Sequence, residues 1–248
     1  MSETETRSRR VIDFHSHVLP NIDDGSSSLE MSREIMEETR RQKVKKMVAT
    51  PHFYPEEMSL SRFLEKRERA VEEVLSVFDS STCPRVFLGA ETGYFRGIGD
   101  SDEISQLTIV GTNTILVEMP FRPWSEATVE DIISLSMQRG LNVVLAHIER
   151  YRTFFSDRTM DRLLSSGIYI QSNAEFFLDK EKEKDAMDML SSDRIHILGS
   201  DVHNTGQRRQ RIGEAREKIR ETLGEETMER ILETSRFLLS GALSIDEI

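Results

Sequence analysis

At residues 11–25 the sequence reads VIDFHSHVLPNIDDG, a short apolar run that leads into two histidines and then into two acids. Residues i and i+2 of a β-strand point to the same face, so a strand here directs the side chains of His15 and His17 toward one point. Two imidazoles on one face, with Asp23 and Asp24 close behind, have the geometry of metal ligands if other parts of the chain supply more. The stretch therefore predicts a strand that ends at a metal site.

The size and charge of the chain limit what it can be. Its 248 residues, 37% hydrophobic and 31% charged, are enough to bury one sizeable core. No linker or repeat divides them, so we expect a single domain over residues 10–240, with a flexible N-terminal arm at 1–9 and a C-terminal tail at 241–248. The net charge of −11 argues against a nucleic-acid partner, because nucleic-acid affinity comes mainly from a basic surface.

The N-terminal residues and the cysteine content predict the cellular compartment of the protein. The first ten residues, MSETETRSRR, lack the apolar core of a signal peptide, and no apolar run approaches the ~20 residues of a membrane span. The single cysteine, Cys83, excludes an internal disulfide and is compatible with a reducing compartment. We therefore expect a cytoplasmic protein that does not insert into a membrane.

Short β-branched runs alternate with longer amphipathic segments along the chain. Strands are predicted at residues 10–14, 45–49, 85–88, 114–117, 142–146, 168–171 and 195–198. Helices are predicted at residues 29–44, 60–78, 129–139, 158–165, 180–190, 207–223 and 225–239. This alternation is typical of β/α units around a parallel sheet.

Residues that can bind metal follow the predicted strands where each strand ends. In a parallel β/α barrel these ends open onto one face, so the side chains would meet there. A single Glu or His at a strand end is usually solvated, but surface histidines have no reason to gather at the same end of several strands. Mixed imidazole and carboxylate ligands without sulfur suit Mn, Fe or Zn. The nine candidates are His15, His17, Asp24, His52, Glu91, Glu118, His147, Asp201 and His203, whereas His196, inside the last predicted strand, is expected to be a packing residue.

The ordered motifs DFHSHVLPNIDDG, ATPHFYP, LGAETGY, LVEMP, AHIERY and LGSDVHN resemble the polymerase and histidinol phosphatase (PHP) superfamily. The chain is more closely similar to the bacterial PHP-type protein-tyrosine phosphatases of capsule and exopolysaccharide loci, over about residues 10–239. The resemblance implies an α/β fold with a distorted seven-stranded, TIM-like (β/α)7 barrel. It also implies three bound metal ions, typically manganese, with Fe, Zn or Mg as alternatives.

The resemblance also implies a role for each motif residue. The first metal ion would take His15, His17, Glu91 and Asp201; the second Glu91 as a bridge with Glu118 and His147; the third Asp24, His52 and His203. Arg150 in HIERY matches a phosphate-binding arginine of the family. A second arginine is expected just after SDVHN, where Arg208 is the first choice and Arg209 and Arg211 are alternatives. Arg150 and Arg208, together with Asp201 and His203, form the implied catalytic set.

The implied activity is hydrolysis of phosphotyrosine in proteins by metal-activated hydroxide. The implied partner is the Tyr-rich tail of a membrane-associated tyrosine kinase that regulates capsule or exopolysaccharide synthesis. Glu37, Arg40 and Arg41 match an E-x-x-R-R pattern that the family uses at oligomer contacts, so a homo-oligomer is expected. An aryl phosphate also fits the aromatic residues that follow the metal-bearing strands, namely Phe53, Tyr54, Tyr94, Phe121 and Trp124.

Three other functions stay open from the sequence. The substrate could be a small alcohol phosphate such as histidinol phosphate. The protein could be a metal-dependent nuclease or amidohydrolase, since those barrels also begin with HxH. It could also be a catalytically idle, metal-stabilised regulator that binds a kinase. A cysteine phosphatase needs an arginine six residues after its cysteine, and Gly89 stands at that position after Cys83, so that chemistry is excluded.

Overall fold

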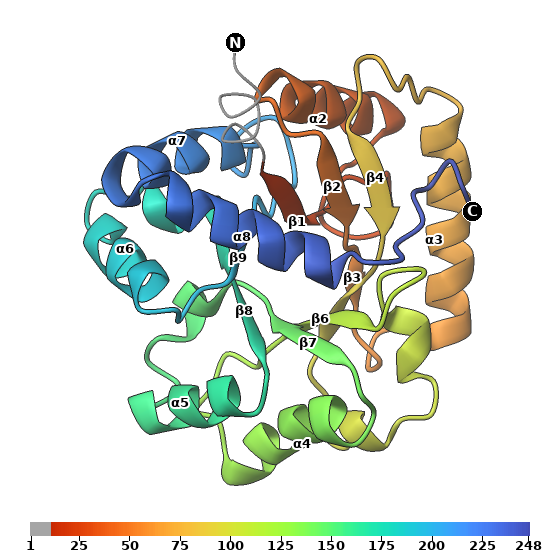
Figure 1. Ribbon diagram of the computed structural model, residues 1–248. Helices are drawn as coiled ribbons and strands as arrows, with labels where there is room; N and C mark the ends of the chain where they lie inside the picture. Colours follow the sequence, from red (N-terminus) through yellow and green to blue (C-terminus); the bar gives the residue numbers. More distant parts are fainter. Residues whose placement is uncertain (1–10) are drawn as a thin grey trace.

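The computed structural model describes residues 11–248, in which helices surround a strongly curled parallel sheet (Figure 1). The strands are β1 (Ile12–Ser16), β2 (Lys46–Ala49), β3 (His52–Phe53), β4 (Arg85–Leu88), β5 (Glu91–Gly93), β6 (Thr114–Glu118), β7 (Asn142–Leu145), β8 (Tyr169–Asn173) and β9 (Ile197–Gly199). The helices are α2 (Leu29–Arg41), α3 (Leu60–Leu75), α4 (Glu126–Met137), α5 (Asp157–Ser165), α6 (Glu183–Ser191), α7 (Ile212–Leu223) and α8 (Glu225–Leu238). The predicted arm at residues 1–9, and Arg10 at the predicted start of the first strand, lie outside the described residues.

The strands pair in parallel in two sheets, in the orders β1-β2-β4 and β3-β5-β6-β7-β8-β9. Only two residues separate β2 from β3 and β4 from β5, so the same two chain segments contribute to both sheets. Pro51, between β2 and β3, has no N–H to donate to a neighbouring strand. The predicted α/β class is confirmed. The predicted strands end at residues 49 and 88, as β2 and β4 do, but the short strands β3 and β5 that follow them were not predicted.

These interruptions position two of the candidate ligands. His52 begins β3 and Glu91 begins β5, and the two residues are register partners. The N–H of Glu91 donates to the carbonyl oxygen of Pro51 (3.0 Å), so the new pairing starts directly after the break. A bridge between Ser16 and Val202 links the end of β1 to the segment that follows β9.

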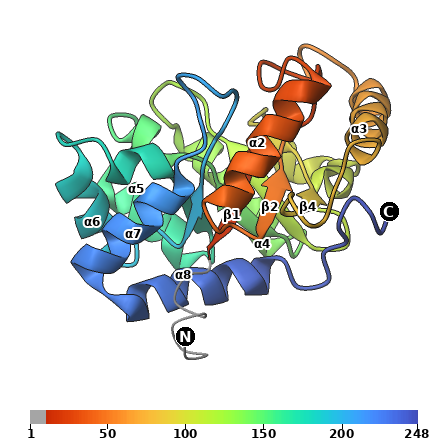
Figure 2. The same ribbon diagram turned by 90° about the horizontal axis from the view of Figure 1, so that it is seen from above.

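Alternating residues of the strands pack in opposite directions. Ile12 and Phe14 of β1 belong to an apolar cluster with Leu232 and Leu238, on α8. In Figure 1 helix α8 crosses in front of the strands, and in Figure 2 it lies along one edge of the molecule. Because side chains alternate along a strand, His15 of β1 points to the opposite face, away from this cluster.

Serine residues cap the N-termini of four helices, and two helix boundaries differ clearly from the predicted ones. Ser28, Ser59, Ser125 and Ser156 each accept a hydrogen bond from a backbone N–H of the first turn of α2, α3, α4 and α5, respectively. Helix α4 therefore begins at Glu126, before the predicted start at residue 129. Helix α2 ends at Arg41, before the predicted end at residue 44, because Lys43 takes a left-handed conformation (φ 65°).

The predicted helix over residues 207–223 is shorter in the structure, because α7 begins only at Ile212. The five preceding residues form a loop in which the N–H of His203 donates to the carbonyl oxygen of Arg208 (2.9 Å). This contact brings residues 207–211 back toward the end of β9. The prediction of helix was wrong here, and the difference places an arginine beside the candidate ligands.

The segment expected to be a tail packs against the sheet. Ile245 is buried, and its N–H donates to the carbonyl oxygen of Val86 in β4 (2.8 Å). Ser244 forms an antiparallel bridge with Phe87. No helix within residues 11–248 combines the length and the apolar character that crossing a membrane requires.

Candidate metal centre

The chain passes very close to two histidines of the HSH stretch. A Cβ atom at Gly25 would lie 2.3 Å from Cβ of His17, and one at Gly199 would lie 2.5 Å from Cβ of His15. No other residue type fits at these distances. The glycines of the DDG and LGS motifs therefore allow the loop after β1 and the end of β9 to pack against the histidines.

Two candidate ligands have a left-handed backbone, which is uncommon for residues other than glycine. His147 has φ 31° and Asp201 has φ 53°. Hydrogen bonds hold both conformations: the N–H of His147 donates to Oε1 of Gln171 (2.8 Å), and the N–H of Asp201 donates to the carbonyl oxygen of His15 (2.8 Å). Backbone strain of this kind is concentrated at functional sites.

The first group of candidates meets around one point. Nε2 of His15 lies 3.1 Å from Nε2 of His17 and 3.0 Å from Oε2 of Glu91. Oδ1 of Asp201 lies 3.5 Å from Nε2 of His15 and 3.4 Å from that of His17. All four side chains are buried, so these polar atoms face one another and not solvent.

Glu91 links this group to a second one through its two oxygens. Its Oε2 atom faces His15 and His17, whereas Oε1 lies 2.7 Å from Nε2 of His147. Nε2 of His147 is also 3.4 Å from Oε1 of Glu118. A carboxylate with one oxygen in each of two groups has the geometry of a bridging ligand.

The third group contains Asp24, His52 and His203. Oδ1 of Asp24 lies 3.2 Å from Nε2 of His203 and 3.6 Å from Nε2 of His52. Nδ1 of His52 is also 3.1 Å from Oε2 of Glu91. The same nitrogen is 4.0 Å from Oε2 of Glu118, so His52 lies between Asp24 of the third group and the glutamates of the second, whereas the family resemblance placed it in the third group alone.

The spacing and hydrogen bonding of these atoms fit metal coordination. Ligand atoms about 2.1 Å from a common ion lie about 3.0–3.4 Å apart, close to the separations within the groups. The Nδ1 atoms of His15, His17 and His203 face oxygens of Gln171, Asp23 and the Asp201 backbone, respectively. Donation from Nδ1 leaves the Nε2 lone pair for an ion. Nε2 of His203 is buried and has no hydrogen-bond partner in the structure.

The electrostatics of the centre favour positive charge. Burial alone would raise the pKa of Glu91 and of Asp201, but nearby histidines outweigh burial and hold both pKa values well below the usual range. Burial would lower the pKa of His147, but hydrogen bonds to Glu118 and Glu91 raise the pKa to about 9. The carboxylates thus stay ionised and attract cations. Metal ions would supply that charge in place of the imidazole protons.

Two arginines reach the edge of this centre. Nη2 of Arg150 contacts Oδ2 of Asp201, and Nη2 of Arg208 lies 2.9 Å from the same oxygen. Nη1 of Arg208 is also 3.4 Å from Oδ2 of Asp24. Both side chains are about one-third exposed, at 34% and 38%, so their guanidinium groups remain within reach of a ligand from solvent.

The two alternative arginines have other partners. Arg209 pairs with Glu214 (3.2 Å), and Arg211 pairs with Glu175 and Glu214 (2.8 Å each). Arg208 is therefore the member of the RRQR segment that contacts candidate ligands.

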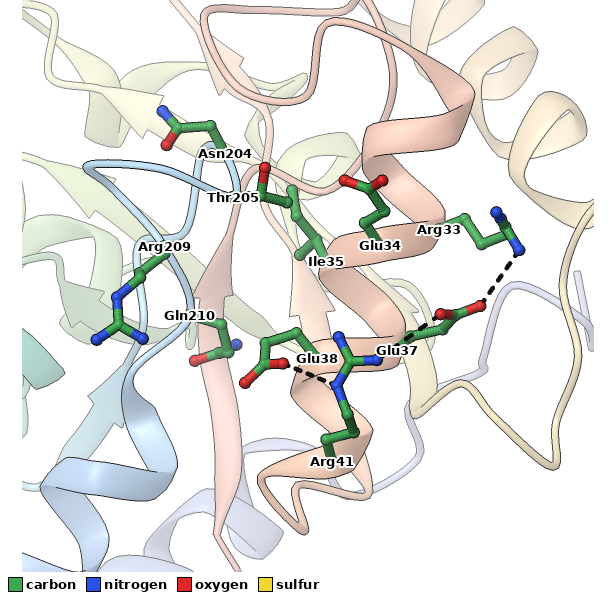
Figure 3. Close-up of a pocket in the computed structure, with 10 residues that line it drawn as sticks. All are labelled: Arg33, Glu34, Ile35, Glu37, Glu38, Arg41, Asn204, Thr205, Arg209 and Gln210. Atoms are coloured by element: carbon green, nitrogen blue, oxygen red, sulfur yellow. Dashed lines mark hydrogen bonds and ion pairs between the residues drawn. The ribbon is translucent and has the colours of Figure 1, made fainter.

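Arg209 instead lines a separate pocket of about 520 Å³ between α2 and residues 204–210 (Figure 3). In this pocket Arg41 is held by Glu38 (2.8 Å) and Arg33 by Glu37 (3.5 Å), so these charges of α2 are paired within the chain. None of the nine candidate ligands lines it. It is therefore distinct from the metal centre.

The motifs predicted no role for the residues that hold the ligands in place. Oε1 of Gln171 accepts from His15, and Nε2 of Gln171 donates to Asn173, which in turn donates to Oδ2 of Asp201 (2.9 Å). Oδ2 of Asp23 likewise lies 2.7 Å from Nδ1 of His17 and holds that imidazole in its orientation. The signal for Gln171 and Asn173 is their i, i+2 spacing, which directs both side chains to one face at the end of β8. Nothing in the DD pair distinguishes the role of Asp23 from that of Asp24.

The five aromatic residues separate into different settings. Phe53 is buried against Phe63 and does not border the centre, so that part of the expectation was wrong. The Tyr54 hydroxyl lies 2.9 Å from Nδ1 of His52 and donates to Glu118 (2.5 Å). Phe121 is exposed beside His147. Tyr94 donates to Asp131, and Trp124 is half-buried.

The fold and the site together define a class: an α/β protein whose curled parallel sheet carries a buried histidine and carboxylate cluster that can hold metal ions. A family model described as "Capsular polysaccharide synthesis, CpsB/CapC" matches residues 11–237, and the chain belongs to this family.

Named relatives agree with this assignment. The tyrosine-protein phosphatase CpsB of Streptococcus pneumoniae is 31% identical over 214 residues, which cover 80% of this chain and 85% of the relative. The tyrosine-protein phosphatase YwqE of Bacillus subtilis (strain 168) is 25% identical over 241 residues, covering 92% and 91%. The motif-based recognition of the family is confirmed, and the activity named for these relatives is the one that the motifs predicted.

The fold also matches a solved structure. A chain described under "Crystal structures of YwqE from Bacillus subtilis and CpsB from Streptococcus pneumoniae, unique metal-dependent tyrosine phosphatases" aligns with a TM-score of 0.80. The identity is 22%, and the alignment covers 94% of this chain and 96% of that one. At this identity the match supports the shared architecture of the curled sheet and its surrounding helices.

Proposed function

We propose that this chain is a metal-dependent tyrosine-protein phosphatase of capsular polysaccharide synthesis. One observation carries the proposal: two guanidinium groups, of Arg150 and Arg208, meet at one oxygen of Asp201, beside a buried cluster of imidazoles and carboxylates. Such a cluster is suited to metal ions, and the paired guanidiniums are suited to the oxygens of a phosphoryl group. The names of the relatives support the same activity.

The metal ligands in this proposal are the nine residues that the motifs predict. His15, His17, Glu91 and Asp201 form one site; Glu91, Glu118 and His147 the second; Asp24, His52 and His203 the third, with His52 near the second as well. Manganese is the proposed metal, at three ions per chain. When bound, the ions would supply an activated water and positive charge at the reacting phosphate.

The residues of the chain have defined tasks in this mechanism. Arg150 and Arg208 exchange their contacts with Asp201 for the phosphoryl oxygens, and hold the phosphate against the ligand groups. Gln171 and Asp23 keep His15 and His17 in orientation. The phenol of tyrosine has a pKa of about 10, so it leaves with less help from a proton donor than an aliphatic alcohol would need.

Several further features belong to the proposal. The two sheets would act as one distorted seven-stranded barrel, closed by the bridge between Ser16 and Val202. The chain would act as one domain and form a homo-oligomer through Glu37, Arg40 and Arg41. The substrate would be the Tyr-rich tail of a membrane-associated tyrosine kinase. The cytoplasmic location stays a prediction.

The test compares substrates under saturating manganese. We expect kcat/KM to be highest for a phosphotyrosine peptide, lower for the matching phosphoserine peptide and lower for histidinol phosphate. Arg150→Ala should slow turnover of the phosphotyrosine peptide while the bound manganese stays unchanged. A preference for histidinol phosphate would overturn the protein-phosphatase proposal and leave the metal assignment standing.

A further inference from the structure

Phe121 is an exposed aromatic residue next to the metal centre. Its side chain is 58% exposed, although a phenyl ring gains free energy when it is buried. It follows Glu118, at the end of β6, by three residues, and its ring lies nearly parallel to that of His147 (centroids 6.5 Å apart, 19° between planes). Among the exposed large apolar side chains of residues 11–248, Phe121 is the one that contacts a candidate ligand.

A rigid aromatic cluster supports the inner side of this ring. Phe121 packs against the buried ring of Tyr151 (5.1 Å), which packs against Trp124 (5.5 Å). Trp124 in turn stacks on Phe155 (4.9 Å, 24°). Phe121 is the most exposed ring of this cluster, since Tyr151 is buried and Trp124 and Phe155 are half-buried.

The backbone of the Phe121 loop is also held in place. The N–H of Trp124 donates to the carbonyl oxygen of Phe154 (3.0 Å), and its indole N–H donates to the carbonyl oxygen of Pro120 (3.3 Å). Pro120 and Pro123 limit the backbone conformations between these contacts. The ring is therefore presented in a fixed position, and a ligand that stacks on it loses little free energy in ordering the loop.

The candidate phosphate-binding residue Arg150 is next in sequence to Tyr151, the ring that packs against Phe121. Arg150 and Tyr151 are consecutive residues of the 3-10 helix η3 (Ile148–Tyr151), which begins directly after His147. The same short element thus carries the candidate guanidinium and the ring that supports Phe121. A phosphate engaged by Arg150 would have its ester substituent within the neighbourhood of Phe121.

We propose that Phe121 is the specificity-determining residue for the aryl group of the substrate: its exposed face stacks against the phenyl ring of phosphotyrosine while the arginines engage the phosphate. This inference rests on the proposed phosphatase function. Stacked aromatic pairs are favourable beyond the burial of area, and they act on the ring and not on the phosphate. Phe121 therefore selects aryl over alkyl phosphate esters.

The experiment measures binding of two phosphonates, which carry the charged group and resist hydrolysis. Phenylphosphonate and methylphosphonate are titrated into the manganese-loaded protein and followed by calorimetry. We expect Phe121→Ala to weaken phenylphosphonate binding by about tenfold or somewhat less, and to leave methylphosphonate binding within about twofold. Phe121→Trp should retain the preference for the phenyl compound, and Phe121→Leu should lose most of it.

Phe237 provides a matched control, because it is a 56% exposed phenylalanine on α8, at a distance from the ligand groups. Phe237→Ala should change neither affinity. Equal affinities of the wild-type protein for the two phosphonates, or equal losses for both in Phe121→Ala, would overturn the inference. If phosphotyrosine turnover remains normal in that case, the proposed function stands; failure of the wild-type protein to turn over phosphotyrosine would instead count against the proposed function.

Discussion

The carboxylate of Asp23 fixes the orientation of His17, with Oδ2 lying 2.7 Å from Nδ1 of the imidazole. The N–H groups of Gly25 and His52 also donate to this carboxylate, at 2.9 Å each. Burial would raise the pKa of Asp23, but these hydrogen bonds and the charge of His17 outweigh burial and lower the pKa. Asp23 therefore stays ionised and keeps Nε2 of His17 directed at the ligand group.

Replacing Asp23 by asparagine tests this role. Asp23→Asn keeps the volume and removes the charge, so we expect manganese affinity to fall about 10- to 100-fold while the protein remains folded. Metal titration measures the effect, and circular dichroism checks the fold. Asp79→Asn is the control, because Asp79 is an exposed acid whose carboxylate accepts hydrogen bonds from the N–H and the hydroxyl of Ser81. Unchanged manganese affinity in Asp23→Asn would contradict the assignment.

Glu91 is expected to be the most sensitive of the proposed ligands, because each of its oxygens belongs to a different group. Glu91→Gln should abolish phosphatase activity and lower the number of bound metal ions, with the fold retained. Chelator treatment of the wild-type protein should abolish activity as well, and added manganese should restore it. Glu175→Gln, at an acid paired with Arg211, should behave as wild type. Full activity of metal-free protein would rule out the proposed mechanism.

The adjacent residues Arg208 and Arg209 form a matched pair of the same charge. Arg208→Ala should lower kcat/KM for phosphotyrosine about 100-fold, because a preorganised cation that stabilises the reacting phosphate is lost. Arg209→Ala should have little effect, because Arg209 pairs with Glu214 (3.2 Å) and not with the candidate ligands. Steady-state kinetics of both variants measure which of the two arginines contributes to kcat/KM. The reverse order of effects would mean that Arg209 engages the phosphate.

Cys83 should be dispensable for catalysis. It is a buried free cysteine that belongs to the hydrophobic core, and no candidate ligand lies among its hydrogen-bond partners within residues 11–248. Cys83→Ser places a hydroxyl in that core at a cost of about 1–3 kcal/mol in the free energy of unfolding, with kcat/KM unchanged. Denaturant titration and kinetics measure the two quantities separately. Loss of turnover in a folded Cys83→Ser protein would instead indicate that the Cys83 thiol takes part in catalysis.

His196 should destabilise the protein in acid. Burial lowers its pKa, and its Nδ1 accepts the N–H of Ile170 (2.9 Å), which a protonated ring nitrogen cannot do. Above the unfolded-state pKa of about 6.5 the residue is neutral in both states, and its full contribution is present. As the pH falls below that value the unfolded state binds the proton more readily, so stability decreases.

The matching variant is His196→Gln, which removes this titration. We expect the loss of unfolding free energy between about pH 7.5 and about pH 5 to be smaller in His196→Gln than in the wild type. Denaturant titrations at both pH values measure the difference. An equal loss in the two proteins would show that His196 does not contribute to the acid response.

Much of the fold class was predictable from local patterns. β-Branched runs and helical periodicity both show which side chains of an element are buried, and this pattern repeats along the whole element. The parallel sheet and the order of the helices were predictable for this reason. The short strands β3 and β5, which resume after Ala49 and Leu88, were not predicted, because they depend on how these segments pair across the sheet. The loop at residues 207–211 was predicted as helix, because the hydrogen bonds that hold Gln210 against Asp13 and Thr39 join residues far apart in the chain and leave no local signal.

The sequence by itself determined which residue types stand at the strand ends, and so the chemistry open to the site. Histidines and carboxylates without a second cysteine restrict the ligands to nitrogen and oxygen, and the spacing of His15 and His17 places both on one face of a strand. Only the tertiary structure decided the distances between elements: that Glu91 directs one oxygen to each of two groups, and that Arg208 and not Arg209 reaches Asp201. The physical reason is that residue type and strand periodicity are local properties, whereas the position of one strand end relative to another depends on the packing of the whole sheet.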